Sequence, residues 1–459
     1  MRGINTWSYA PYKPLLSDVE DIYICRVAPN ENSIHLEWLG TSDEYKIYYR
    51  KRNGDIFISA GKTETSEFDI TDLENETEYE FYVSSGNKKS RVRFARTCEA
   101  IGAVVNYLHP DDDAYAFSGK YLASPSLLKH PDGYLLASTD IFGPLTPQNL
   151  TLIYRSDDNG QSWHYLSELM PCFWGKLFVH NGEIYMMSVS TEYGDLLIGK
   201  STDGGKTFSA PVCLMRGSNG KNGFPGFHKA PQNFICRNGR LYFTVEWGSW
   251  GNKAGYKHAA LMLSIDANDD LLVPENWTFT NPIKFEVFAS ELEGLTSNAM
   301  TIEGTPVVTP DGRIMNVMRF QKYGYALAYE LDNEESLSYS HIFEFPTNDS
   351  KFTIKHDVIS GNYYSIINEK CDDSKRDDRN ILSLAVSGDL KTWQIAARLI
   401  DNSHIDPKMV GFQYVDFDFD GDDIIFLCRT AWNNAHDYHD SNYITFHRIK
   451  DFRKISQRN

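Results

Sequence analysis

The feature that most constrains the fold of this chain is a short turn pattern that recurs along it. The pattern reads Ser-x-Asp-x-Gly-x-Ser/Thr-aromatic, and it stands at Ser156–Trp163, directly after an apolar run. It returns at Ser201–Phe208, and a shortened form that lacks the fifth-position glycine stands at Ser387–Trp393. Asp and Ser side chains bond nearby backbone, glycine permits positive φ, and an aromatic residue fixes the turn to a core. A recurring turn module indicates a recurring supersecondary unit.

This pattern resembles the Asp-box of the sialidase-like (neuraminidase, BNR-repeat) β-propellers. The resemblance implies a propeller fold over residues 101–455. The boxes themselves are structural, and we assign them no catalytic role. Since enzymes and binding proteins both carry such boxes, they indicate the fold and leave the activity open.

The chain from residue 101 onward shows a second regularity, in which an apolar strand runs into a tight turn and out into another strand six times. The six turns are His130–Gly133, His180–Gly182, Arg237–Gly239, Pro310–Gly312, Ser360–Gly361 and Asp420–Asp422. A third strand follows each pair, and an outer strand follows the first five. We expect residues 101–108 to supply the missing outer strand and to close a six-bladed propeller, which leaves no exposed edge. Seven blades is the alternative.

The preceding residues predict a different all-β unit. Residues 1–17 have little periodicity and are interpreted as an extended arm, whereas residues 18–98 hold seven short alternating strands, which favour a β-sandwich. Trp38 stands where a buried core tryptophan is expected. Leu73–Tyr79 resembles the tyrosine corner of fibronectin type III domains, and this resemblance implies a module that supports, spaces or binds.

Charge and cysteine content narrow the partners and the compartment. The 459-residue chain carries a formal net charge of −17, which disfavours nucleic acid and anionic membrane surfaces as partners. Its seven cysteines show no CxxC spacing, and most lie in apolar runs, as expected for buried reduced thiols. No stretch has the apolar length of a signal peptide or a membrane span. These features favour a cytoplasmic protein, and the alternative is a secreted protein whose signal segment is not part of this sequence.

Propeller geometry predicts where chemistry lies. If the glycine turns share one face, the starts of first strands and the ends of second strands share the other face, which is a loop-lined mouth suited to ligands. His228 is placed there as a general acid or base, and Glu246 and Glu303 as a carboxylate pair of the glycosidase kind. Tyr193 joins them as a candidate proton-abstracting residue. The alternative for each is structural: a strand cap for the histidine and backbone hydrogen bonding for the glutamates.

The same mouth is predicted to bind the substrate. Arginine matches a carboxylate with two parallel hydrogen bonds, and tryptophan suits the apolar face of a sugar ring. The predicted substrate-binding residues are Lys176, Arg319, Arg429, Trp247, Trp250, His258, Tyr323 and Tyr443. Surface ion pairing for the arginines, and a plugged channel for the tryptophans, are the alternatives.

We expect no cofactor and no metal. Residues 416–421 begin like a calcium-binding loop, but Leu427 stands where the bidentate glutamate is required. His436 and His439 have metal-ligand spacing but no matching partner elsewhere in the sequence, so a metal there is a minority alternative.

These residues predict a carbohydrate-active enzyme. The first hypothesis is a glycoside hydrolase of the sialidase-like fold that acts on a glycan containing a uronic or sialic acid. The chain lacks an Arg-Ile-Pro motif ahead of the first box, so the resemblance does not specify the sugar. A polysaccharide lyase that uses His228, Tyr193 and Arg319 beside a uronate is the second hypothesis, and a non-catalytic glycan-binding propeller is the third.

Overall fold

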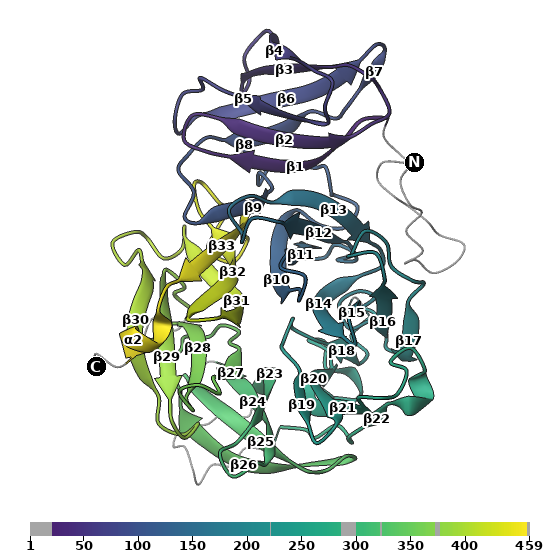
Figure 1. Cartoon of the computed structure of the whole chain (residues 1–459), viewed down its shortest axis with the longest axis vertical. Helices are drawn as coiled ribbons and strands as arrows, with labels where there is room; N and C mark the ends of the chain where they lie inside the picture. Colours follow the sequence, from purple (N-terminus) through teal and green to yellow (C-terminus); the bar gives the residue numbers. More distant parts are fainter. Residues whose placement is uncertain (1–20, 221, 286–299, 322–323, 372–376, 457–459) are drawn as a thin grey trace.

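The computed structural model describes residues 21–220, 222–285, 300–321, 324–371 and 377–456. The predicted arm at residues 1–17 lies outside these ranges. The described chain is nearly all β-strand, with a sandwich at one end of the molecule and a ring of sheets at the other (Figure 1).

The sandwich consists of two sheets with the strand orders β1-β2-β5 and β4-β3-β6-β7, and β8 also pairs with β6. The strands are β1 (Tyr23–Pro29), β2 (Ile34–Leu39), β3 (Tyr45–Lys51), β4 (Ile58–Thr63), β5 (Glu67–Ile70), β6 (Glu78–Ser85), β7 (Lys88–Lys89) and β8 (Arg93–Arg96). Trp38 is buried in the core between the sheets. The backbone N–H of Glu74 donates to the Tyr79 hydroxyl at 2.9 Å, which confirms the predicted tyrosine corner.

Six sheets follow, and they make a six-bladed β-propeller. Blades 1 to 3 contain β10 (Tyr121–Lys129), β11 (Leu135–Phe142), β12 (Thr151–Ser156), β13 (His164–Leu169); β14 (Phe173–His180), β15 (Glu183–Val189), β16 (Leu196–Ser201), β17 (Val212–Met215); and β18 (Gly226–His228), β19 (Ile235–Arg237), β20 (Arg240–Gly248), β21 (Ala259–Asp266), β22 (Thr278–Phe279). In blade 3 the innermost strand is split, because β18 and β19 both pair with β20.

Blades 4 to 6 complete the ring. They contain β23 (Met300–Val308), β24 (Ile314–Gln321), β25 (Tyr325–Asn333), β26 (Ser336–Glu344); β27 (Ile354–His356), β28 (Tyr363–Asn368), β29 (Ile381–Ser387), β30 (Gln394–Asp401); and β31 (Gly411–Asp420), β32 (Asp423–Ala431), β33 (Tyr443–Ile449). The outer strand of blade 6 is β9 (Ala103–Tyr107), which pairs with β33. The predicted closure by residues 101–108 is therefore confirmed. Two 3-10 turns (Lys253–Gly255, Pro274–Asn276) and the helix α2 (Phe452–Ser456) are the helical elements of the described residues.

The Ser-x-Asp turns join the third and fourth strands of their blades. In the first turn Asp158 accepts hydrogen bonds from the backbone N–H and the hydroxyl of Ser162, at 2.9 and 2.6 Å. Asp203 accepts the same two bonds from Thr207 at the same two distances. The aromatic residue that ends the first turn, Trp163, is buried in the core. These contacts give the turns a structural part, as expected.

The sandwich is less separate from the propeller than the sequence suggested. Tyr23 and Cys25 of β1 belong to the same apolar cluster as the blade 1 core, and the hydroxyls of Tyr23 and Tyr115 are hydrogen-bonded at 2.9 Å. The Arg26 guanidinium donates to the carbonyl of Val105 in β9 at 2.8 Å. Strand β9, which closes the propeller, is thus also a strand against which the sandwich packs.

Candidate active site

A cavity of about 380 Å³ opens at the end of the propeller axis opposite the Ser-x-Asp turns. It lies where second strands end, which is the face that the sequence predicted. Side chains from all six blades line it, among them Ser124, Phe142, Trp174, Glu192, His228, Trp250, Glu303, Arg319, Arg379, Tyr414, Arg429 and His439.

Bulges in the innermost strands direct several of these side chains into the cavity. Strands β10, β14, β23 and β31 each carry a break in register, and the residue within it has left-handed backbone. These residues are Ser124, Trp174, Glu303 and Tyr414, with φ of 41°, 51°, 60° and 54°. Non-glycine residues adopt such φ values at a cost, and both bulges and strained backbone gather at functional sites. All four line the cavity.

The bulge in β23 explains why a glycine follows Glu303. A Cβ atom on Gly304 would stand 2.0 Å from the side-chain oxygen of Asn316. Only glycine lets the bulged strand approach its neighbour this closely. Gly304 therefore permits the bulge that directs the Glu303 carboxylate toward the propeller axis.

Glu303 is ionised and held between two partners. Its carboxylate accepts a hydrogen bond from the Arg319 guanidinium at 2.8 Å; Glu303 and Arg319 are buried, and Tyr414 is partly buried. Burial acts to raise the pKa of Glu303, but Arg319, His228 and a hydrogen bond with Tyr414 outweigh it and lower that pKa. Burial and the charge of Glu303 raise the pKa of the Tyr414 hydroxyl. The result is a neutral phenol beside an ionised carboxylate.

Two further arginines surround Tyr414. The guanidinium carbons of Arg379 and Arg429 lie 5.9 and 5.1 Å from the centre of its ring. Arg379 donates to the side chain of Gln413 and to the backbone carbonyl of Asp349, and Arg429 donates to the carbonyl of His439. Within the described ranges, neither guanidinium forms an ion pair with a carboxylate, and the buried Nε atoms of Arg319, Arg379 and Arg429 have no hydrogen-bond partner.

This surplus of buried positive charge has an electrostatic cost. Burial, together with neighbouring arginines, lowers the pKa of Arg379 and lowers that of Arg429 to about 10. A buried charge without a counterion is strongly unfavourable. The cavity is consequently suited to an anionic ligand.

His228 lines the cavity, and Glu246 orients its imidazole ring. Its Nδ1 lies 2.5 Å from a carboxylate oxygen of Glu246, whose other oxygen accepts the backbone N–H of Gly304 at 3.0 Å. The imidazole packs on the ring of Trp174, with the ring centres 4.2 Å apart. Glu246 thus links His228 to the Glu303 bulge, and it supports both residues from outside the cavity lining.

Glu192 is the second carboxylate that faces the cavity. It follows β15, and its carboxylate accepts a hydrogen bond from the Gln148 side chain at 3.1 Å. Burial raises its pKa, although the nearby His228 acts in the opposite direction. A carboxyl group of this kind stays protonated to higher pH than an exposed glutamate and suits a general acid.

Several predicted residues lie elsewhere, and these placements correct the sequence-based assignment. Trp247 packs on Phe227 within the core of blades 2 and 3, and Tyr443 packs on Tyr107 under the sandwich. Lys176 lies deeper in the channel, where it forms a 2.5 Å ion pair with Asp416. Trp247 and Tyr443 thus belong to packed cores, and Lys176 belongs to the channel below the cavity.

Tyr193 and His258 form a buried pair beside the cavity. The Tyr193 hydroxyl lies 2.8 Å from Nε2 of His258, and the two rings contact His228. Burial lowers the pKa of His258 well below the ordinary value, so its ring is neutral. These two residues support His228 and do not line the cavity. Trp250 lines it and is half exposed, whereas predicted Tyr323 lies outside the described residues.

The two histidines considered for a metal have other partners. His436 is hydrogen-bonded to the Tyr121 hydroxyl at 2.7 Å, and His439 to Asp440 at 3.1 Å. The described part of the chain contains no group of three or more His, Cys, Asp or Glu side chains placed to hold a metal ion.

The sequence-based assignment missed Arg379, Tyr414 and Trp174 as members of the site, and it placed Glu192 at the mouth without giving it a role. The bulge in β31 shifts the inward position by one residue to Tyr414, and Arg379 lies within a charged stretch that resembles a solvent loop. The available signal was an aromatic residue at the start of an innermost strand, as Trp174 and Tyr414 are.

A larger cavity, of about 510 Å³, opens at the other end of the axis. Its charged side chains have partners close by: Lys355 pairs with Asp418 at 3.1 Å, and Lys129 pairs with Asp420 at 2.6 Å. Because these charges are neutralised locally, the smaller cavity is the better candidate for chemistry.

Comparisons with known proteins agree with the architecture. Residues 22–97 match the fibronectin type III domain model. Over the whole chain the structure is similar to a Hadza microbial sialidase, with a TM-score of 0.53 and 13% identity, covering 98% of each chain. A leech intramolecular trans-sialidase complexed with 2,7-anhydro-Neu5Ac gives a TM-score of 0.50 at 9% identity, covering 96% of this chain and 92% of that one.

A mutant α-L-arabinofuranosidase from Fusarium graminearum, complexed with an iminosugar inhibitor, gives a TM-score of 0.50 at 13% identity, covering 72% of this chain and 93% of its own. No curated protein sequence matches significantly. None of the helices in the described residues is long and apolar enough to cross a membrane. The fold is therefore a sialidase-like propeller preceded by a fibronectin type III sandwich, and at these identities the likeness concerns the fold alone.

Proposed function

We propose that this protein is a glycoside hydrolase that acts on a glycan containing a carboxylated sugar, such as a uronic or sialic acid. The observation that carries the proposal is the pair of buried arginines, Arg379 and Arg429, that lack carboxylate partners in the described structure and flank Tyr414 beside Glu303. The relatives named above include sialidases and an arabinofuranosidase, which supports a carbohydrate-active enzyme at the level of the fold.

The arginines bind the substrate carboxylate in this proposal. A guanidinium presents parallel N–H groups that match a carboxylate, and the three unpartnered Nε atoms are donors available to it. Arg319 is already paired with Glu303, so Arg379 and Arg429 supply the uncompensated charge. A bound carboxylate removes the electrostatic cost of these two buried cations, which gives specificity for acidic over neutral sugars.

Tyr414 acts as the nucleophile. Its oxygen bonds to the anomeric carbon while the bond from that carbon to the leaving oxygen breaks. Glu303 accepts the phenol proton, and Glu192 donates a proton to the leaving oxygen. A neutral phenol is preferred over a carboxylate here, since the substrate's own carboxylate would repel a charged nucleophile at close range. Sialidases are known to use a tyrosine in this way.

Water completes the reaction. It attacks the anomeric carbon, gives a proton to Glu192 and releases the tyrosine oxygen, which recovers its proton from Glu303. Two displacements at one carbon retain the anomeric configuration.

His228 is held by Glu246 and contacts Trp174, so it positions the sugar. Half-exposed Trp250 contacts the leaving group at the rim of the cavity.

The purified protein should be tested on para-nitrophenyl glycosides of glucuronic acid, galacturonic acid and N-acetylneuraminic acid, with the neutral glucose and galactose glycosides as controls. We expect nitrophenol release from one acidic glycoside and none from its neutral counterpart. Turnover confined to neutral glycosides would contradict the proposal.

A polysaccharide lyase is the second candidate, because His228 lines the cavity and is oriented by Glu246 as a base would be. A lyase leaves an unsaturated uronate that absorbs ultraviolet light, whereas a hydrolase does not. Incubation with polyuronates, followed by absorbance, separates the two. Binding of acidic oligosaccharides without either product would favour a glycan-binding protein.

A further inference from the structure

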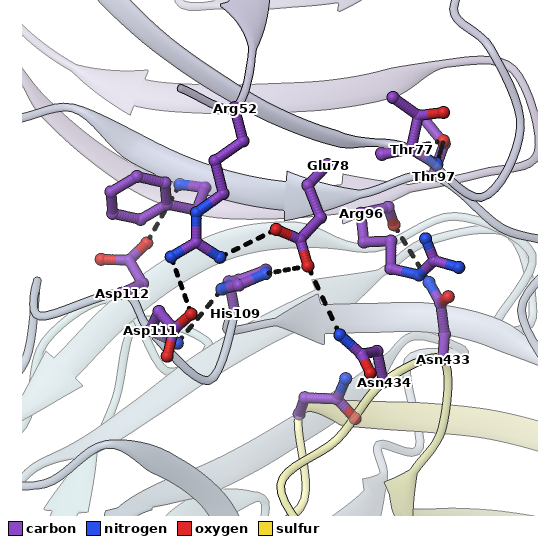
Figure 2. A network of polar contacts seen from close by, with 12 residues as sticks. Arg52, Thr77, Glu78, Arg96, Thr97, His109, Asp111, Asp112, Asn433 and Asn434 are labelled. Atoms are coloured by element: carbon purple, nitrogen blue, oxygen red, sulfur yellow. Dashed lines mark hydrogen bonds and ion pairs between the residues drawn. The ribbon is translucent and has the colours of Figure 1, made fainter. Parts of the chain in front are cut away.

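The loop that joins β32 to β33, residues 432–442, contacts the sandwich at its start and the cavity near its end. Figure 2 shows Asn433 and Asn434 of this loop facing Glu78 and Arg96 of the sandwich. We refer to it as the 432–442 loop. It is the segment through which the two parts of the molecule meet beside the candidate site.

Three hydrogen bonds anchor the start of the loop. The Trp432 indole N–H donates to the carbonyl of Glu99 at 3.1 Å, and the Asn433 side chain donates to the carbonyl of Arg96 at 3.1 Å. The Asn434 side chain donates to the Glu78 carboxylate at 3.4 Å.

Asn433 and Asn434 have left-handed backbone, with φ of 51° and 68°. Asparagine tolerates this conformation better than most residues, but two in succession need external support. The sandwich supplies that support through its strands β6 and β8, which carry Glu78 and Arg96.

A chain of ion pairs and hydrogen bonds holds the middle of the loop. Arg52 contacts Glu78 at 2.8 Å and Asp111 at 2.7 Å. Asp111 lies 3.6 Å from His436, whose other ring nitrogen lies 2.7 Å from the Tyr121 hydroxyl. Tyr121 begins β10, the strand that carries the Ser124 bulge. The sandwich is thereby connected to the inner wall of the cavity as well as to the loop.

The end of the loop holds the arginines. The carbonyl of Tyr438 accepts a hydrogen bond from Gln413 at 2.5 Å, and Gln413 in turn accepts one from Arg379. The carbonyl of His439 accepts a hydrogen bond from Arg429. Both arginines that lack a carboxylate partner in the described structure are thus oriented through two consecutive residues of this loop.

We propose that the sandwich is a positioning element of the candidate active site: Glu78 and the Arg96 carbonyl hold the 432–442 loop, and the loop holds Arg379 and Arg429. The mechanical coupling stands on the contacts alone. Its consequence for substrate binding rests on the proposed function. None of the sandwich residues lines the cavity, so their influence on it passes through the 432–442 loop and the contact of His436 with Tyr121.

Amide hydrogen exchange measured by mass spectrometry on the full-length protein tests the coupling without a substrate. The test variants are Glu78→Ala, from the sandwich side, and Asn433→Gly, from the loop side. Their matched controls are Glu44→Ala, at an exposed sandwich glutamate paired with Lys62, and Asn238→Gly, at a hairpin asparagine that also has φ of 51°. Glycine accepts the left-handed backbone, so Asn433→Gly removes the amide contacts and not the conformation.

Both test variants should raise exchange in peptides covering residues 436–441 by about threefold or more, as expected for the loss of one hydrogen bond, while both controls leave these peptides unchanged. The same variants should weaken binding of glucuronic acid or N-acetylneuraminic acid, measured by calorimetry, by about three- to tenfold.

Exchange that rises only in sandwich peptides, or in neither variant, would overturn the proposal. A global loss of protection, seen in the distant blades 2 and 3, would show that the contacts serve stability and not the loop, which also overturns it. If neither acid binds the wild-type protein, the proposed function fails, whereas the exchange result still decides the coupling.

Discussion

Glu303 and Tyr414 occupy equivalent positions on two different blades. Each is the left-handed residue of a bulge in the innermost strand, with φ of 60° in β23 and 54° in β31, and the two side chains interact within the cavity. Pleated strands alternate their side chains between the two faces of a sheet, so regular strands would not aim these two residues at one point. The paired bulges therefore assemble the reactive groups, and Arg319 fixes the charge of one of them.

Replacement of Arg379 and Arg429, which have no carboxylate partner among the described residues, should reduce affinity for acidic sugars selectively. Arg379→Lys and Arg429→Lys keep a positive charge but lose the planar fork, so each should weaken binding of an acidic sugar by about ten- to a hundredfold, equivalent to about 1.5–3 kcal/mol. Binding of the corresponding neutral sugar should change little. Calorimetry with both sugars measures the difference, and Arg240→Lys, a partly buried arginine bonded to Ser264 and Thr278 in blade 3, is the control. An equal loss for both sugars would indicate general disruption.

The pH profile of kcat/KM should have widely separated limbs. Glu303 must be ionised, and since its pKa is lowered, activity should persist below the usual range of glutamate as the pH falls. Glu192 must be protonated, and since its pKa is raised, activity should be lost only as the pH rises above that range. Glu192→Gln should abolish the alkaline limb for a substrate with a good leaving group, which needs no acid. An alkaline limb that survives in Glu192→Gln and disappears in His228→Asn would assign the acid to His228.

The Ser-x-Asp turns should matter for stability and not for binding. Asp203→Ala removes two hydrogen bonds from Thr207 and one from Ser201, which should lower the free energy of unfolding by about 1–2 kcal/mol. Asp157→Ala, at an exposed pair with Arg155, should change it by less than about 0.5 kcal/mol. Denaturant unfolding measures both, and ligand affinity should be unchanged in each. A loss of ligand affinity at unchanged stability in Asp203→Ala would indicate that the ligand site lies on the face of the Ser-x-Asp turns and not on the opposite face.

The fold was predictable because its determinants are local and repeated. Turn patterns such as Ser156–Trp163 and the glycine hairpins fix strand boundaries, and the unmatched apolar segment at 101–108 indicated how the ring closes. The apolar alternation of residues 18–98 likewise identified the sandwich, but its shared core with blade 1 depends on long-range contacts of Tyr23 and Cys25 that no local pattern reveals.

The site was predictable only in part. His228, Glu303, Arg319, Arg429 and Trp250 were identified from strand positions, and all line the cavity. Tyr414 and Arg379 were missed for a physical reason: a bulge moves the inward position by one residue, and Arg379 follows a charged stretch whose composition is typical of a solvent loop. Trp247 and Tyr443 were misplaced because an aromatic side chain at a strand end packs equally well into a core: that of blades 2 and 3 for Trp247, and that under the sandwich for Tyr443.

The most direct test of the central claim is to identify the nucleophile. A fluorinated acidic sugar with a fluoride leaving group slows hydrolysis of the covalent intermediate, so that intact and digested protein can be weighed by mass spectrometry after brief incubation. We expect one added sugar per chain, located on the peptide that contains Tyr414, and no adduct in Tyr414→Phe, whose turnover should fall by at least about a thousandfold, as for other catalytic nucleophiles. Two results would contradict this expectation in a protein that turns over an acidic glycoside. One is a label on Glu303, and the other is full activity of Tyr414→Phe.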